Sequence, residues 1–277
     1  MPFVKKKSLA AVNLTDCVDF MRANGYTKRM AHWLDKTFFP FDREIFSWMH
    51  ALQQKAGGFF NGFCKFVSFF GELGWFFIVT AFVFLLFRKM RRTGLCMAFA
   101  LFIGALITNI LLKNLVDRAR PFNSNELFRL WWTAAGASPE DSPSFPSGHT
   151  TAAFAAGVAF FLAADKRYSW TGLAFAVLTA FSRVYLIVHY PTDVLAGMLV
   201  GTAAGFGGWL FSTLTYRKAS GRLRTLLTEA SILRLFRRRS CNCSADTPPP
   251  DNAPVQEQPA VDTCNAATDN EQENKQL

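Results

Sequence analysis

The chain has 277 residues, of which 51% are hydrophobic and 15% aromatic, while only 18% are charged. Ordinary soluble domains contain about 25% charged residues, so this composition excludes a disordered or fibrous protein. The formal net charge of +10 lies beside long uncharged runs, which makes a membrane surface a better partner than nucleic acid. We therefore interpret the chain as an integral membrane protein that does not bind nucleic acid.

The N-terminal part of the chain, residues 1–65, contains no stretch long enough to cross a bilayer. It holds ten Lys and Arg residues against five acidic residues, and its apolar residues come in short pieces such as residues 42–52, DREIFSWMHAL. This pattern is typical of amphipathic helices that lie in the membrane interface. We therefore predict an interfacial segment over residues 1–65, in which His32 and His50 have packing or interfacial roles.

Five segments approach or reach the length of about 20 apolar residues that a membrane-spanning helix needs. They are residues 66–87, 93–112, 149–164, 168–188 and 194–216. The first reaches this length only by extending back across Glu72, and the fourth contains Arg183. Small residues throughout the third favour close helix packing inside a bundle. The sequence thus predicts an all-α, polytopic bundle of about five transmembrane helices over residues 66–216.

Two polar segments follow the predicted spans. Residues 217–239 contain eight Lys and Arg residues and one Glu, which predicts a basic juxtamembrane helix. Residues 240–277 reverse the sign, with seven acidic residues, one Lys and a run of three Pro. This composition predicts a disordered acidic tail.

The basic residues between the spans predict the orientation of the chain. Residues 88–92 (RKMRR) join the first two spans, Lys166 and Arg167 join the third and fourth, and residues 217–239 follow the fifth. Five crossings place all three segments on one face, which the positive-inside rule assigns to the cytoplasm. We therefore predict a multi-pass protein of the plasma (inner) membrane whose other span ends lie on the extracytoplasmic face.

Three short polar clusters lie at those other span ends. Residues 113–121 (KNLVDRARP) end the second span, residues 145–149 (FPSGH) begin the third, and residues 182–193 (SRVYLIVHYPTD) lead from the fourth into the fifth. An up-and-down bundle brings these ends together, so their cations, histidines and acid describe a pocket for a phosphorylated group. The residues of this pocket are Lys113, Arg120, Arg183, His149, His189 and Asp193.

The spacing within the first two clusters has a physical interpretation. Lys113 and Arg120 are seven residues apart, so two helical turns place them on one side of a helix. Pro121 disfavours the helical conformation at the residue before it and so marks the end of that helix. Ser147 and Gly148 come just before the third span, where the amide groups of a helix N-terminus favour phosphate.

The third cluster combines a histidine with a carboxylate. Pro191 suits the first turn of the fifth span and leaves Asp193 in that turn, within reach of His189 as an orienting group. Arg118 is interpreted as a partner of Asp117, as a solvated side chain or as a phosphate neighbour. No cluster of Asp, Glu or Cys at metal-ligand spacing accompanies the motifs, so we expect neither a metal nor another cofactor.

The three motifs KxxxxxxRP, PSGH and SRxxxxxHxxxD together resemble the signature of the type 2 phosphatidic acid phosphatase superfamily. The resemblance covers residues 42–213, because DREIFSWMHAL and FFGELG are similar to the lead-in of bacterial members, particularly the undecaprenyl-diphosphate phosphatases. The matching positions are Lys113, Arg120, Pro121, Pro146, Ser147, Gly148, His149, Ser182, Arg183, His189 and Asp193.

The resemblance implies a metal-independent lipid phosphatase that works through a phosphohistidine. It implies that His189 attacks phosphorus, that Asp193 fixes the tautomer of His189, and that His149 protonates the leaving oxygen and then activates water. The phosphate-binding residues that it implies are Lys113, Arg120, Ser147, Gly148 and Arg183.

Several functions remain open at this point. Undecaprenyl diphosphate is the first substrate that we expect, and phosphatidate or phosphatidylglycerol phosphate is the second. A phosphohistidine can also be intercepted by an alcohol, which would make the protein a lipid phosphotransferase. A lipid-phosphate binder or scramblase is the alternative from outside enzymes. The presence of His149, His189 and Asp193 favours an enzyme, because a binder needs no nucleophile.

Overall fold

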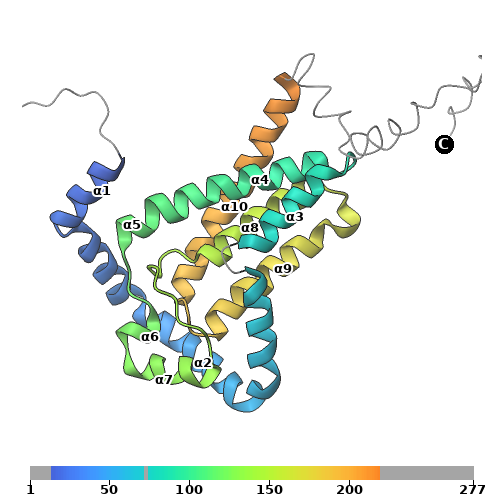
Figure 1. The fold of residues 1–277 in the computed structure, drawn as a ribbon. Helices are drawn as coiled ribbons and strands as arrows, with labels where there is room; N and C mark the ends of the chain where they lie inside the picture. The colour runs from blue at the N-terminus through green and yellow to red at the C-terminus, as the bar shows by residue number, and fades with distance from the viewer. Residues whose placement is uncertain (1–13, 72–73, 219–277) are drawn as a thin grey trace, which may run out of the picture. The chain divides into compact units, whose positions relative to one another are not determined.

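A computed structural model describes residues 14–71 and 74–218 of the chain, and these residues form helices and connecting loops without a strand (Figure 1). This confirms the predicted all-α fold. The elements are α1 (Leu14–Ala23), α2 (Tyr26–Gly71), α3 (Trp75–Leu86), α4 (Arg91–Ala105), the π-helix η2 (Leu106–Leu112), α5 (Lys113–Val116), α6 (Pro121–Ser124), α7 (Glu126–Ala135), α8 (Gly148–Ala163), α9 (Lys166–Tyr185) and α10 (Pro191–Lys218). The predicted acidic tail, and the basic helix beyond Lys218, lie outside the described residues.

The first predicted span covers the end of α2 and α3, and the other four correspond to α4 with η2, α8, α9 and α10. By length and apolarity alone, the segment Arg91–Ser124, which runs from α4 to α6, and the helix Pro191–Lys218 are able to cross a membrane. A third crossing is possible if α2 and α3, whose axes differ by 53°, act together as one span. Helix α8 is apolar but shorter. The structure therefore supports a polytopic membrane bundle.

The N-terminal segment folds into longer helices than its short apolar pieces suggested. Helix α2 contains 46 residues and changes direction at Ala56, which has a non-helical φ of −139° and ψ of 18°. The part before Ala56 carries residues 42–52, and the part after it turns back along the bundle and packs against α9 (Figure 1). The predicted interfacial position of this segment stays a prediction.

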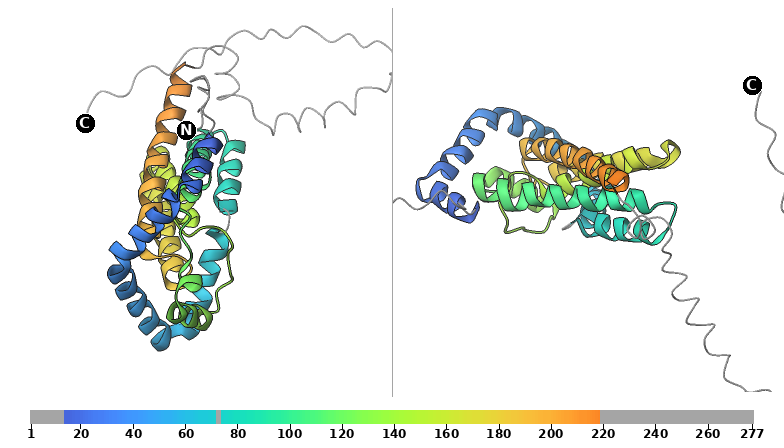
Figure 2. Two further views of the ribbon diagram at one scale, coloured as in Figure 1. Left: turned by 90° about the vertical axis from the view of Figure 1, so that its left-hand side faces the viewer. Right: turned by 90° about the horizontal axis from the view of Figure 1, so that it is seen from above.

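Helix α10 packs against α8 and α4 at backbone contact distance, and the helices lie side by side in Figures 1 and 2. A Cβ atom on Gly201 would lie 2.6 Å from the carbonyl oxygen of Thr151, and one on Gly208 would lie 2.5 Å from the backbone nitrogen of Ala100. Small residues at these positions of the fifth predicted span let the backbones approach, and one of the helices that they meet is α8, the third predicted span. This contact sets the first turns of α8 and α10 together, with the Ser147 amide donating to the Asp193 carbonyl at 3.1 Å.

We expect Gly201→Ala to destabilise the bundle, because its methyl group would collide with the Thr151 carbonyl. Overpacking of a close contact costs about 1–3 kcal/mol. Gly207→Ala is the matched control, since its methyl group would meet only the tip of the Ile103 side chain at 3.4 Å. Thermal unfolding in detergent micelles should show a lower Tm for Gly201→Ala alone. Equal Tm values for the two variants would contradict the backbone contact.

Candidate active site

The three polar clusters meet around a cavity of about 170 Å³ that is lined by α3, α4, η2, the first turns of α8, the loop before α8 and His189 in the loop after α9. Its polar end is lined by Lys113, Glu140, Ser142, Gly148, His149 and His189. Its other end is apolar and is lined by Ile78, Leu101 and Ala105 among others. The predicted up-and-down arrangement therefore places the motifs together, in a site that has both a polar and an apolar side.

His189 is held in one tautomer by the groups around it. Its Nδ1 atom lies 2.8 Å from the carbonyl oxygen of Ser144, which can only accept, so Nδ1 carries the proton. Its Nε2 atom accepts from Nη1 of Arg120 at 3.3 Å and therefore has the lone pair. Burial lowers the pKa of His189 to about 4, although the interaction with Asp193 opposes this shift. At neutral pH, His189 thus presents an unprotonated Nε2 beside a cation.

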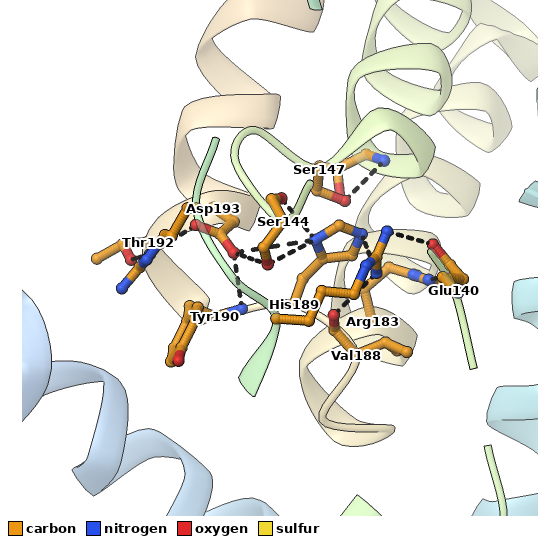
Figure 3. A network of polar contacts seen from close by, with 12 residues as sticks. Glu140, Ser144, Ser147, Arg183, Val188, His189, Tyr190, Thr192 and Asp193 are labelled. Atoms are coloured by element: carbon orange, nitrogen blue, oxygen red, sulfur yellow. Dashed lines mark hydrogen bonds and ion pairs between the residues drawn. The ribbon is translucent and has the colours of Figure 1, made fainter. Parts of the chain in front are cut away.

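Asp193 orients His189 less directly than the sequence predicts. Its Oδ2 atom lies 3.9 Å from Nδ1 of His189, which is beyond hydrogen-bond distance. The Ser144 hydroxyl donates to Oδ2 at 2.5 Å, and the Ser144 carbonyl accepts a hydrogen bond from Nδ1–H of His189 (Figure 3). Ser144 is therefore a functional residue that the sequence analysis missed. The sequence feature that could have identified Ser144 is its place two residues before Pro146 of the second motif.

The structure contradicts all three interpretations of Arg118. This side chain is 1% exposed, so it is not solvated, and its guanidinium pairs with Asp193 at 2.6 Å and with Asp42 at 3.1 Å. It also contacts Asp35 at 2.7 Å. Asp117, the expected partner, has a left-handed backbone (φ 47°) that ends α5. Arg118 therefore bonds to the orienting carboxylate and to α2, and it does not line the cavity.

Lys113 and Arg120 converge, but not by helical spacing. The helix ends at Val116, so residues 117–120 are not helical, and Pro121 starts the short helix α6 instead of ending a helix. The two cations meet at Ser142, whose Oγ lies 3.2 Å from Nζ of Lys113 and 3.0 Å from Nη2 of Arg120. Ser142 was also missed, because nothing in its local sequence indicates this contact.

A carboxylate lies between the two arginines of the site. Glu140 Oε2 is 2.6 Å from Nη2 of Arg120, and its Oε1 pairs with Nη2 of Arg183 (Figure 3). Burial alone would raise the pKa of Glu140, but the positive charges around it, that of Arg183 foremost, hold this pKa well below its usual value. The site therefore holds an anion with two oxygens on two guanidiniums, an arrangement that also suits a phosphate. The sequence analysis did not single out Glu140.

The start of α8 is where the sequence predicts it. Ser147 is the N-cap residue, and Gly148 and His149 form the first turn. The hydroxyl of Ser147 accepts from the amide and the hydroxyl of Thr150, at 3.4 and 3.0 Å. Ser147 thus acts as a helix cap that satisfies one of the free amide groups in the first turn of α8. A phosphate contact from Ser147 or Gly148 stays a prediction.

His149 completes a group that the sequence analysis did not foresee. One ligand atom from each of Glu140, His149 and His189 lies within 4.8 Å of the others, so these residues form a candidate metal site. The charge around the group favours an anion instead, because Arg120 and Arg183 already bind the carboxylate and would repel a cation. We therefore interpret this end of the cavity as an anion site.

We expect Glu140→Gln to bind inorganic phosphate more tightly, because it removes a negative charge that competes for the two arginines. A tenfold lower Kd corresponds to about 1.4 kcal/mol and is the size of effect that we expect. Isothermal titration calorimetry at pH 7 in detergent measures it. Asp141→Asn, which removes the same charge from an exposed neighbour, should leave the Kd unchanged. Weaker phosphate binding by Glu140→Gln would show that Glu140 assists the anion.

The sequence matches a known family and is similar to several named proteins. The family model described as the PAP2 superfamily matches residues 93–217. The chain is 37% identical over 112 residues to undecaprenyl-diphosphatase BcrC of Bacillus subtilis, which is 40% of this chain and 54% of that protein. It therefore spans about half the length of that relative.

Two further relatives are covered over more of their length. The undecaprenyl-diphosphatase of Sulfolobus acidocaldarius is 33% identical over 53% of this chain and 68% of its own. The lipid A 4'-phosphatase of Bacteroides thetaiotaomicron is 33% identical over 60% of this chain and 78% of its own. Among solved structures, the transmembrane PAP2 type phosphatidylglycerolphosphate phosphatase from Bacillus subtilis aligns with a TM-score of 0.53. It is 24% identical, over 70% of this chain and 96% of that one, and so supports the fold.

Proposed function

The chain belongs to the PAP2 superfamily, a family of membrane lipid phosphatases, and from this premise we propose that it hydrolyses a lipid phosphate or diphosphate through a phosphohistidine on His189. The observation that carries the proposal is the lone pair on Nε2 of His189 beside the anion-binding guanidinium of Arg120. A nucleophile next to an anion site is what phosphoryl transfer requires.

The proposed reaction has two steps. Nε2 of His189 attacks phosphorus, the bond to the leaving oxygen breaks, and His149 donates a proton to that oxygen. His149 then takes a proton from water, whose oxygen attacks the phosphohistidine and releases phosphate and the free ring. Lys113, Arg120 and Arg183 stabilise the charge on the nonbridging oxygens. The cations supply this stabilisation without a divalent ion.

The lipid part of the substrate is assigned to the apolar side of the cavity. Ile78, Leu101 and Ala105 continue from the polar end, so one molecule with a phosphorylated head and an apolar chain fits both sides. We propose undecaprenyl diphosphate as the substrate, because two of the relatives are named as undecaprenyl-diphosphatases. A lipid A phosphate is the second candidate, since a relative named as a lipid A 4'-phosphatase is covered over more of its length.

The experiment that tests this function is phosphate release from a panel of purified lipid phosphates by detergent-solubilised protein in EDTA. We expect release from undecaprenyl diphosphate to exceed release from lipid A, phosphatidate and phosphatidylglycerol phosphate. We expect His189→Ala to abolish release and to keep the Kd for inorganic phosphate within about threefold, because the arginines supply the affinity. His32→Ala, at a histidine far outside the motifs, is the control for loss of a ring.

Three outcomes would contradict the proposed function. Activity that is lost in EDTA and restored by Mg²⁺ would contradict the histidine mechanism. Activity of His189→Ala within tenfold of the unaltered protein would remove His189 from the nucleophile position. Lipid-phosphate binding without any phosphate release would make the protein a binder or a scramblase.

We further propose that the site faces the outside of the plasma (inner) membrane. Three basic stretches of the chain lie together at the end of the bundle that is remote from the site. Nη2 of Arg92 lies 3.5 Å from Oγ1 of Thr213 near the end of α10, and the Thr93 hydroxyl donates to Ala163 at the end of α8. One end of the bundle therefore carries the basic residues 88–92, Lys166, Arg167, Arg217 and Lys218. The positive-inside rule favours the cytoplasmic side for this end.

Single cysteines in a Cys-free background test this orientation. We expect Asn123→Cys, which is exposed near the site, to react with a membrane-impermeant maleimide in intact cells. Lys89→Cys, exposed at the basic end, should react only after lysis, because it is expected to face the cytoplasm. The reverse labelling pattern would place the site inside the cell and contradict an external substrate.

A further inference from the structure

The segment of residues 42–52 belongs to the N-terminal helix α2, yet one of its acidic side chains is completely buried. Asp42 is 0% exposed, while its neighbours Phe41, Arg43 and Glu44 are exposed. Burial of a carboxylate is costly unless the charge is paired and hydrogen-bonded. Asp42 therefore has specific partners, and they identify what this part of α2 does.

Those partners lie in the first turn of α10 and in the loop before α6. Oδ1 of Asp42 accepts from the Thr192 amide at 3.0 Å, and Oδ2 accepts from the Thr192 hydroxyl at 2.9 Å. Oδ2 also accepts from Nη2 of Arg118 at 3.1 Å. Asp42 thus joins α2 to the residue that precedes Asp193.

The guanidinium of Arg118 is fixed on several sides. Its Nη1 donates to Oδ1 of Asp193 at 2.6 Å and to the Thr192 hydroxyl at 2.8 Å, and its Nη2 bonds Asp42. The ring of Tyr190 packs on the guanidinium, with the centroid 3.8 Å from Cζ. The Arg118 side chain is therefore held in one orientation, in which Nη1 bonds the carboxylate of Asp193 and Nη2 bonds that of Asp42.

These contacts form a continuous chain that ends at the reacting ring. Arg118 donates from Nη2 to Oδ2 of Asp42 and from Nη1 to Oδ1 of Asp193. Oδ2 of Asp193 is left for the Ser144 hydroxyl, and the Ser144 carbonyl fixes Nδ1 of His189. Without the positive charge of Arg118, the buried carboxylates of Asp42 and Asp193 would also repel each other.

We propose that Asp42 and Arg118 are a positioning pair through which helix α2 sets the orientation of Asp193 and hence of the His189 nucleophile. This inference rests on the proposed function. The pair affects the rate of the chemical step and not the affinity for the substrate. Neither residue lines the cavity, so neither contacts the phosphate. The N-terminal helix is thereby part of the active centre of this chain, beyond the three motifs.

The hydrophobic contacts of α2 support this placement. Phe46, one turn after Asp42, is 0% exposed and packs against Phe128 and Tyr190, with ring centroids 5.0 and 5.9 Å apart. Tyr190 is also the ring that packs on Arg118. Apolar burial therefore fixes α2 at the position where Asp42 reaches Thr192.

The kinetic constants of Asp42→Asn and Arg118→Lys test the pair. We expect kcat to fall about a hundredfold in each, because a misplaced nucleophile loses its attack geometry, while KM stays within about threefold. Glu44→Gln is the matched control, since it changes an exposed carboxylate two residues away on the same helix and should retain full activity. In the double variant the losses should not add, because both residues act through one contact.

Inhibition by vanadate separates positioning from partial unfolding. Vanadate mimics the transition state when it bonds to Nε2 of a positioned histidine, whereas inorganic phosphate binds as a ground-state anion. We expect the Ki of vanadate to rise in parallel with the loss of kcat in Asp42→Asn and Arg118→Lys, with the Ki of phosphate unchanged. A partly unfolded protein would have fewer active molecules but the same Ki for vanadate.

The outcomes distinguish this pair from the function on which it rests. An unaltered protein that releases phosphate from no lipid would overturn the proposed function and the pair with it. Normal kcat and normal vanadate Ki in both variants of an otherwise active enzyme would overturn the pair alone. A raised KM with unchanged kcat in Arg118→Lys would also overturn it, because Arg118 would then be a substrate ligand.

Discussion

The contact between the first turns of α8 and α10 is the constraint on which the site depends. Gly197 allows it, because a Cβ atom there would lie 2.8 Å from the Ser147 carbonyl. With the two helix starts in contact, the loop before α8 passes Asp193 and His189, so Ser144 can bond to both. The geometry of His189 thus follows from close backbone packing between α8 and α10, which small residues such as Gly197 allow.

The second constraint is the concentration of buried charge in this packed region. Arg118, Arg120 and Arg183 are all buried, and each is compensated by acidic side chains. Arg118 is compensated by the buried Asp42 and Asp193, whereas Glu140 compensates Arg120 and Arg183 at the edge of the cavity. One set of ion pairs therefore fixes the orientation of Asp193, and the other occupies the anion site that we propose for the phosphate.

Much of the fold was predictable because its signals are local. The apolar runs, a helix start next to Ser147 and Gly148, and a first turn of α10 at Pro191 depend on neighbouring residues, and the structure confirms them. The helical spacing of Lys113 and Arg120 was wrong, since the left-handed Asp117 ends the helix and nothing before Pro121 indicated this. The partners of Arg118 lie 76 and 75 residues away, so only tertiary packing determines them. For the same reason Glu140, Ser142 and Ser144 were not assigned.

The central claim is that phosphorus becomes bonded to Nε2 of His189, and trapping this intermediate tests it most directly. His149→Ala should accumulate it, because the weakly basic phosphate that leaves from a lipid diphosphate needs little protonation, whereas water needs the missing base. The variant is mixed with a lipid diphosphate whose terminal phosphate carries ³²P and is quenched in alkali, and labelled peptides are identified by mass spectrometry. We expect an acid-labile, alkali-stable label on His189. Consumption of the lipid without labelled protein, or a label on another residue, would contradict the account.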